Sequence, residues 1–79
     1  MKTPRNISGK ELARKLTALG YEPTRQRGSH LRLRTLQHGE HFVTIPQHEA
    51  IPIGTLNSIL RDVALHFQIE KEVLVEQLF

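Results

Sequence analysis

The pattern of apolar and polar positions predicts a helix at the start of the chain. Three leucines recur at the i, i+4, i+7 spacing of one helix face: Leu12, Leu16 and Leu19. Ser8 and Glu11 have the spacing of a capping box, in which the serine oxygen accepts a backbone hydrogen bond at the helix start. Gly20 suits the position just after a helix because glycine tolerates positive φ. We therefore expect a helix over residues 8–19.

The middle of the chain alternates as half-buried strands do. Residues 30–34 read His-Leu-Arg-Leu-Arg, so the polar side chains and the leucines fall on opposite faces of a strand. The pattern also predicts strands at residues 21–26, where Pro23 favours a sheet edge, and at 41–45. Tight turns are expected at 27–29 and 37–40.

The last third of the chain is helical again. Pro52 and Gly54 mark the start of a helix that runs to about residue 65, and its apolar stripe is Leu56, Ile59, Leu60 and Val63. Residues 69–78 predict a short third helix with its glutamates facing outward. The order α-β-β-β-α plus a short helix indicates an α+β fold, with a three-stranded antiparallel sheet and two helices on one of its faces.

Length and composition restrict what such a fold can do. The 79 residues make a single domain, in which we expect residues 1–6 to be a flexible arm and 66–79 a variable C-terminal extension. The absence of cysteine excludes disulfides, a thiol nucleophile and a cysteine-based zinc site. No apolar run indicates a signal peptide or a membrane span, so the expected location is the cytoplasm.

Positive charge is concentrated in the first part of the chain. Residues 1–48 carry nine Lys/Arg and three Glu, a net charge of +6, and residues 49–79 carry two Lys/Arg and five Asp/Glu, a net charge of −3. A basic front and an acidic back suggest that one face meets an anion such as nucleic acid, although a solvated surface has the same composition.

The exposed face of the strand at 30–34 holds the candidate chemistry. An imidazole and two guanidiniums stand there at i, i+2 and i+4, and further basic residues arrive from neighbouring segments; the expected phosphate-binding set is Arg25, Arg27, Arg32, Arg34 and Lys10. The arginine fork matches phosphate oxygens. Gly28 and Ser29 make a tight turn whose backbone N–H groups and hydroxyl can approach a phosphate.

A histidine among these cations suggests RNA cleavage. RNA carries its own nucleophile, the 2′-hydroxyl, and an ordinary histidine exchanges protons near neutral pH. We expect His30 to be the catalytic group. Taken alone, a single histidine at a strand start is more often structural.

The other four histidines invite a metal site, but their spacing is unlike that of zinc ligands and the nearby carboxylates are sparse. No metal or cofactor is expected. His48 is the second candidate for a functional histidine. His38 and His66 are expected to be exposed to solvent.

Three blocks of the sequence resemble the signature of the HicA toxin family. The first is Gly20 and Tyr21 followed by Arg-Gln-Arg-Gly-Ser-His at 25–30, the second is Thr-Ile-Pro-Gln-His at 44–48, and the third is Gly-Thr-Leu-Asn-Ser-Ile-Leu-Arg at 54–61. The blocks stand in family order, and with the first helix the resemblance covers residues 7–63. The loop at 49–53 is shorter and less basic than is usual in the family.

The resemblance implies a fold, an activity and a partner. It implies a double-stranded-RNA-binding-like fold and an mRNA interferase, the toxin of a type II toxin–antitoxin pair, that cuts RNA without metal. The catalytic histidine of the family matches His30, and the partner it implies is a HicB-type antitoxin. Two alternatives stay open: a non-catalytic RNA-binding module on the same surface, and a domain that pairs only with another protein.

Overall fold

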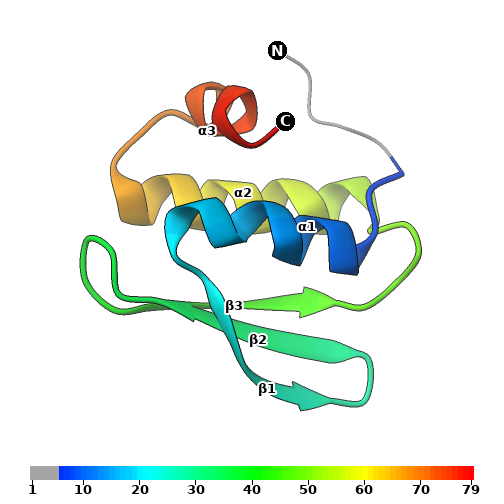
Figure 1. Cartoon of the computed structure of the whole chain (residues 1–79). Helices are drawn as coiled ribbons and strands as arrows, with labels where there is room; N and C mark the ends of the chain where they lie inside the picture. The colour runs from blue at the N-terminus through cyan, green and yellow to red at the C-terminus, as the bar shows by residue number, and fades with distance from the viewer. Residues whose placement is uncertain (1–5) are drawn as a thin grey trace.

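In the computed structural model, which describes residues 6–79, a three-stranded sheet carries helices on one face (Figure 1). The flexible arm expected at residues 1–6 lies outside the described residues apart from Asn6. The order is α1 (Gly9–Leu16), a 3₁₀ turn η1 (Thr17–Leu19), β1 (Glu22–Arg27), β2 (His30–Thr35), β3 (His41–Pro46), α2 (Ile53–Phe67) and α3 (Lys71–Leu78). The α+β fold predicted from the sequence is thus confirmed.

The first helix begins at a side-chain cap. The Ser8 Oγ accepts a hydrogen bond from the Glu11 backbone N–H at 3.0 Å. Within residues 6–79 the Glu11 side chain returns no bond to Ser8, so only half of the expected capping box forms. The helix tightens into the 3₁₀ turn η1 and ends at Gly20, whose φ is +82°.

The three strands form an antiparallel sheet in the order β1-β2-β3. Strand β2 is central, and strand β1 is exposed along its whole length, as expected for the edge strand that Pro23 indicated. The β1–β2 turn uses Gly28 at φ +54°, and the β2–β3 turn uses His38 at +57° and Gly39 at +97°. These turns fall within the residues that the sequence assigned to them.

A bulge in the edge strand β1 changes the sheet face toward which some of its side chains are directed. Glu22 pairs with Arg34, and Pro23 pairs with Leu33, but the next pairs are Arg25 with Arg32 and Arg27 with His30. Thr24 is therefore the extra residue on β1, and its hydroxyl donates to the Arg32 carbonyl at 3.2 Å. An extra residue inverts the alternation of a strand. Without it, Arg25 and Arg27 would point to the opposite face.

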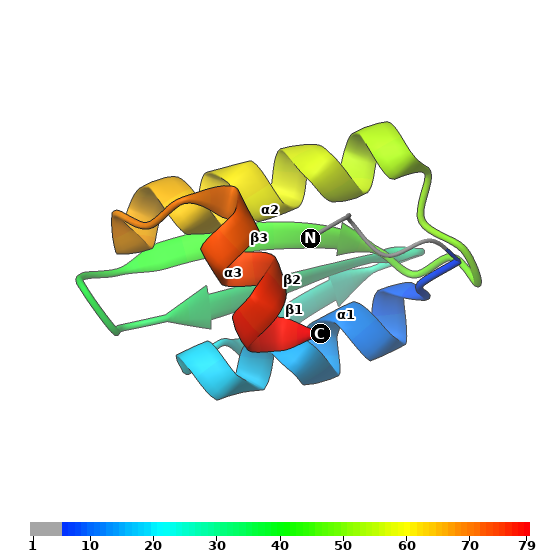
Figure 2. The same cartoon turned by 90° about the horizontal axis from the view of Figure 1, so that it is seen from above.

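The helices form two layers above the sheet. Helices α1 and α2 lie side by side on one sheet face, and α3 crosses over them on the side away from the sheet (Figure 2). The core between these layers includes Leu12, Leu16, Leu33, Ile45, Leu56 and Leu60. Helix α3 adds Leu74, Val75 and Leu78 to it, while Glu70, Glu72 and Glu76 face outward as predicted.

Helix α1 approaches the end of β3 closely at Gly9. The Gly9 N–H donates to the His48 carbonyl at 3.0 Å, and a Cβ at this position would overlap with the carbonyl oxygen of Pro46. Only glycine leaves room for this approach. The contact ties the start of α1 to the end of the sheet where His30 begins β2.

Candidate functional site

The candidate site lies on the sheet face that no helix covers. Strand alternation turns Leu33, Val43 and Ile45 toward the helices and leaves the side chains between them on β2 and β3 exposed on the opposite face. With the two arginines that the bulge reorients, they make up the open face: Arg25, Arg27, His30, Arg32, Arg34, Phe42 and Thr44. Paired residues of neighbouring strands lie side by side, so these side chains form rows perpendicular to the strands.

Part of the open face forms a shallow hollow with a volume of about 200 Å³. Its lining residues are Arg25, Arg27, His30, Arg32 and Thr44. Register places His30 opposite Arg27, and places Arg32 between Arg25 and Thr44. Three guanidiniums thus surround one exposed imidazole, and no Asp or Glu lines the hollow. Such an arrangement can hold a phosphate and exchange a proton beside it.

The turn before His30 is held by two hydrogen bonds to its backbone carbonyls. The Ser29 carbonyl accepts from the Gln47 backbone N–H, which links the turn to the residue after β3. The Gly28 carbonyl accepts from the Gln26 side chain at 3.3 Å. Space around Gly28 is open, since a Cβ there would meet no atom within 4 Å. The side of Gly28 on which a Cβ would stand therefore faces open space.

Two helix starts lie at the same end of the sheet as His30. In Figure 1, α1 and α2 both begin near the end of β3, on the side where the β1–β2 turn lies. A helix start carries a partial positive charge from its aligned peptide dipoles. Both helix starts therefore place a partial positive charge at the end of the sheet where His30 lies.

Five residues of the predicted set do not line the hollow. Gly28 and Ser29 form the turn beside it, and the other three lie farther away: Arg34, Lys10 and His48. Arg34 is on the open face, but its Nη1 is 3.5 Å from the Glu40 Oε2. Lys10 lies on α1 and lines a separate depression with Ser8, Glu11 and Arg14. His48 contributes its carbonyl to the contact with α1, and its exposed side chain is not among the residues that line the hollow.

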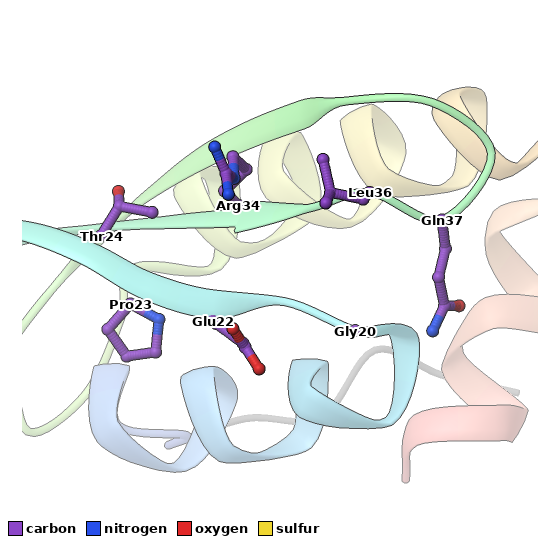
Figure 3. Close-up of a pocket in the computed structure, with 7 residues that line it drawn as sticks. All are labelled: Gly20, Glu22, Pro23, Thr24, Arg34, Leu36 and Gln37. Atoms are coloured by element: carbon purple, nitrogen blue, oxygen red, sulfur yellow. The ribbon is translucent and has the colours of Figure 1, made fainter.

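A larger depression, of about 480 Å³, lies toward the other end of β2. Figure 3 shows its lining: Gly20, Glu22, Pro23, Thr24, Arg34, Leu36 and Gln37. It shares no residue with the hollow, holds no histidine, and contains the carboxylate of Glu22. Its mixed charge and lack of a proton-exchanging group make it a weaker candidate for phosphate chemistry, despite its size.

Two further histidines join a partly buried network between the sheet and α2. The Tyr21 hydroxyl donates to the His41 Nδ1 at 2.7 Å, and the His41 Nε2 donates to the Asp62 carboxylate at 3.3 Å. His66 stacks on His41 with ring centroids 4.4 Å apart, and its Nε2 lies 2.9 Å from the Gln37 carbonyl. The expectation that His66 is exposed is therefore wrong. It is half-buried because it supports the β2–β3 turn.

The chemistry of Tyr21 follows from its burial. The side chain is fully buried. Desolvation, and then the charge of Asp62, raise the pKa of the Tyr21 hydroxyl above its ordinary value of 10. Burial disfavours the phenolate. Tyr21 therefore serves as a neutral hydrogen-bond donor in the network.

Sequence reasoning missed two residues of the open face. Thr44 lines the hollow opposite Arg32. Phe42 lies opposite Arg34, and the Arg32 guanidinium is 4.2 Å from the centre of its ring. The alternation of residues 41–45 was the available signal. It assigns faces only relative to one another, and the β2–β3 register was needed to place these two beside the arginines.

Within residues 6–79, no three His, Asp or Glu side chains converge as ligands for a metal ion. In the same part of the chain, each helix is too short or too polar to cross a membrane.

Comparison with known families matches the chain to bacterial toxins. The model of the HicA toxin of bacterial toxin–antitoxin systems matches residues 9–65, which is more than half of the chain. The matched segment runs from the start of α1 into α2 and includes the whole open face. Neither the curated proteins nor the solved structures yield a match.

Proposed function

The chain belongs to the HicA toxin family, and from that premise we propose that it is an endoribonuclease that cuts mRNA on its open face, with His30 as the catalytic residue. The observation that carries the proposal is the hollow, in which one exposed imidazole lies among three guanidiniums with no carboxylate. The bulge on β1 supports it further, since that irregularity turns Arg25 and Arg27 toward His30.

The proposed reaction is an internal transesterification of RNA. His30 takes the proton of a ribose 2′-hydroxyl, the 2′-oxygen bonds to the adjacent phosphorus, and the bond from phosphorus to the 5′-oxygen breaks. The leaving 5′-oxygen takes up a proton from water, His30 returns its proton to solvent, and the upstream fragment ends in a 2′,3′-cyclic phosphate. Arg25, Arg27 and Arg32 bind the phosphate and stabilise the charge on its oxygens in the transition state. DNA lacks the 2′-hydroxyl and is not cleaved by this route.

The sharpest test is to replace His30 with alanine. We expect His30→Ala to fold normally, because the side chain is exposed, and to lose at least about 100-fold in RNA cleavage, the lower range for a positioned acid–base group. Cleavage is measured on labelled single-stranded RNA in EDTA, and folding by circular dichroism.

Two further histidine variants complete that test. His38→Asn is the matched control, since His38 is exposed away from the open face and asparagine tolerates its positive φ. It should cut at the wild-type rate. His48→Ala examines the second candidate. Full cleavage by His30→Ala would refute the assignment, and RNA binding without products by the wild type would favour a non-catalytic RNA-binding module.

A toxin of this family implies an antitoxin partner. We propose a HicB-type protein that presents acidic side chains to the open face and competes with RNA for it. The positive charge of the hollow supports this, because complementary charge raises the association rate. The cytoplasm, where mRNA and such a partner meet, is the proposed location.

A further inference from the structure

One aromatic ring stands among the charged side chains of the open face. The Phe42 side chain is exposed, at 36% of its full surface, although most of the large apolar side chains of the sheet are buried against the helices. The Arg32 guanidinium lies over its ring, 4.2 Å from the centroid. This contact places a guanidinium and an aromatic ring together beside the hollow, and both groups can stack on a base.

The position of this stack relates it to His30. Arg32 follows His30 by two residues on β2, so their side chains lie on the same face, about 7 Å apart along the strand. Arg32 both lines the hollow and contacts Phe42. A nucleotide whose phosphate lies in the hollow would therefore have its base, or that of its neighbour, within reach of the stack.

Phe42 lies outside the hydrophobic core. Its neighbours Val43 and Ile45 enter the core, whereas its own ring has a charged partner and solvent around it. Aromatic side chains and guanidinium planes are the surfaces on which proteins stack unpaired bases. In a duplex the faces of the bases are already stacked on one another, so this surface discriminates in favour of single strands.

We propose that the stack of Arg32 on Phe42 is a base platform that selects single-stranded RNA and positions it for cleavage at His30. The inference rests on the proposed function and deepens it, because it names the form of the substrate and a residue that determines specificity. Phe42 is a positioning residue in this scheme, since it touches a base and not the reacting atoms.

The test measures binding apart from cleavage. The probe is a single-stranded 2′-O-methyl RNA oligonucleotide, which lacks the attacking hydroxyl, with its duplex for comparison. We expect Phe42→Ala to weaken single-strand binding by about 5- to 100-fold, the contribution of one stacked base, and to leave duplex binding unchanged. Stacking involves no counterion, so the salt dependence of Phe42→Ala should equal that of the wild type. Arg32→Gln should reduce the slope of the logarithm of the binding constant against the logarithm of the salt concentration by about 0.7, the value for one lost phosphate contact on a single strand.

Two variants provide controls. Leu65→Ala removes another exposed apolar side chain, 78% exposed on α2 and absent from the open face, and should bind like the wild type. Phe42→Trp keeps an aromatic platform and introduces the chain's only tryptophan, whose fluorescence should be quenched by a stacked base.

The outcomes separate the two proposals. Unchanged single-strand binding by Phe42→Ala overturns the platform even if the wild type cuts RNA, and leaves a protein partner as the candidate for covering Phe42. Equal losses for single strand and duplex overturn it as well. Loss confined to the single strand, with no cleavage of ordinary RNA by the wild type, supports the platform and refutes the proposed nuclease.

Discussion

At the scale of single residues, the arginines of the open face are not equivalent. Arg25, Arg27 and Arg32 line the hollow around His30, whereas Arg34 lies near the Glu40 carboxylate and beside a depression of mixed charge. That ion pair is exposed, so it contributes little to stability, but it lowers the positive charge available to a ligand at that end. The phosphate-binding strength of the face is therefore concentrated around His30.

Tyr21 gives a prediction about alkaline pH. Its pKa is raised in the folded protein, so the unfolded chain loses the phenol proton first as pH rises. The stability contribution is complete below pH 10 and decreases as pH rises from there toward the folded pKa, by up to about 1.4 kcal/mol per pH unit.

The measurement is urea unfolding across this pH range, with Tyr21→Phe as the reference, because other titrating groups cancel in the difference. Tyr21 is the only tyrosine, so its ionisation can be followed directly by ultraviolet absorbance. Equal pH dependence of the two proteins would contradict the raised pKa.

At the scale of elements, periodicity predicted nearly all of the secondary structure. The leucine stripes predicted α1 and α2, and the alternation in residues 30–34 predicted β2 with His30 and Arg32 on one face. The family resemblance is likewise confirmed by the match over residues 9–65. The catalytic role of His30 stays a prediction.

The bulge and the cross-strand partners were not predictable from the sequence. Regular alternation puts Arg25 and Arg27 on the same face as Pro23, and only the extra residue Thr24 reverses this. The contact of Arg32 with Phe42 and the support of the turn by His66 depend on register and on helix packing. These are long-range contacts, which no local pattern encodes.

The close approach of α1 to β3 gives a prediction at this scale. Gly9→Ala should lower the free energy of unfolding by about 1–3 kcal/mol, because the added methyl meets the Pro46 carbonyl and the helix must shift. Gly54→Ala is the matched control: it lies in the first turn of α2 with open space around it, and should raise stability by about 0.4–1 kcal/mol. Urea denaturation followed by circular dichroism compares the two. A stabilised Gly9→Ala would show that the two elements are not in contact as described.

At the scale of the whole molecule, burial is one-sided. The core lies between the sheet and the helices, and α3 closes the helical layer from outside (Figure 2). Helix α3 lies beyond the residues that match the family model, yet its Leu74, Val75 and Leu78 are buried. The segment expected to be an extension is thus an integral part of the packing.

That role predicts a contrast between two adjacent residues of α3. Leu74→Ala should cost about 2–5 kcal/mol of stability, because it leaves a cavity at a fully buried position. Val73→Ala, at a side chain that is 41% exposed, should change stability by less than about 0.5 kcal/mol. Thermal and urea unfolding measure both. Similar small effects would mean that α3 is only loosely attached.

The bare sheet face also bears on how the molecule tolerates mutation. Because most side chains of the open face lie outside the core, substitutions there alter chemistry without changing how much protein reaches the folded state. Destabilising substitutions in the helices act the other way, because they lower the fraction of protein that is folded. Inactive copies with a damaged open face will therefore accumulate to normal levels. In a screen for loss of toxicity, the cellular amount of the mutant protein alone will distinguish substitutions on the open face from substitutions in the helices.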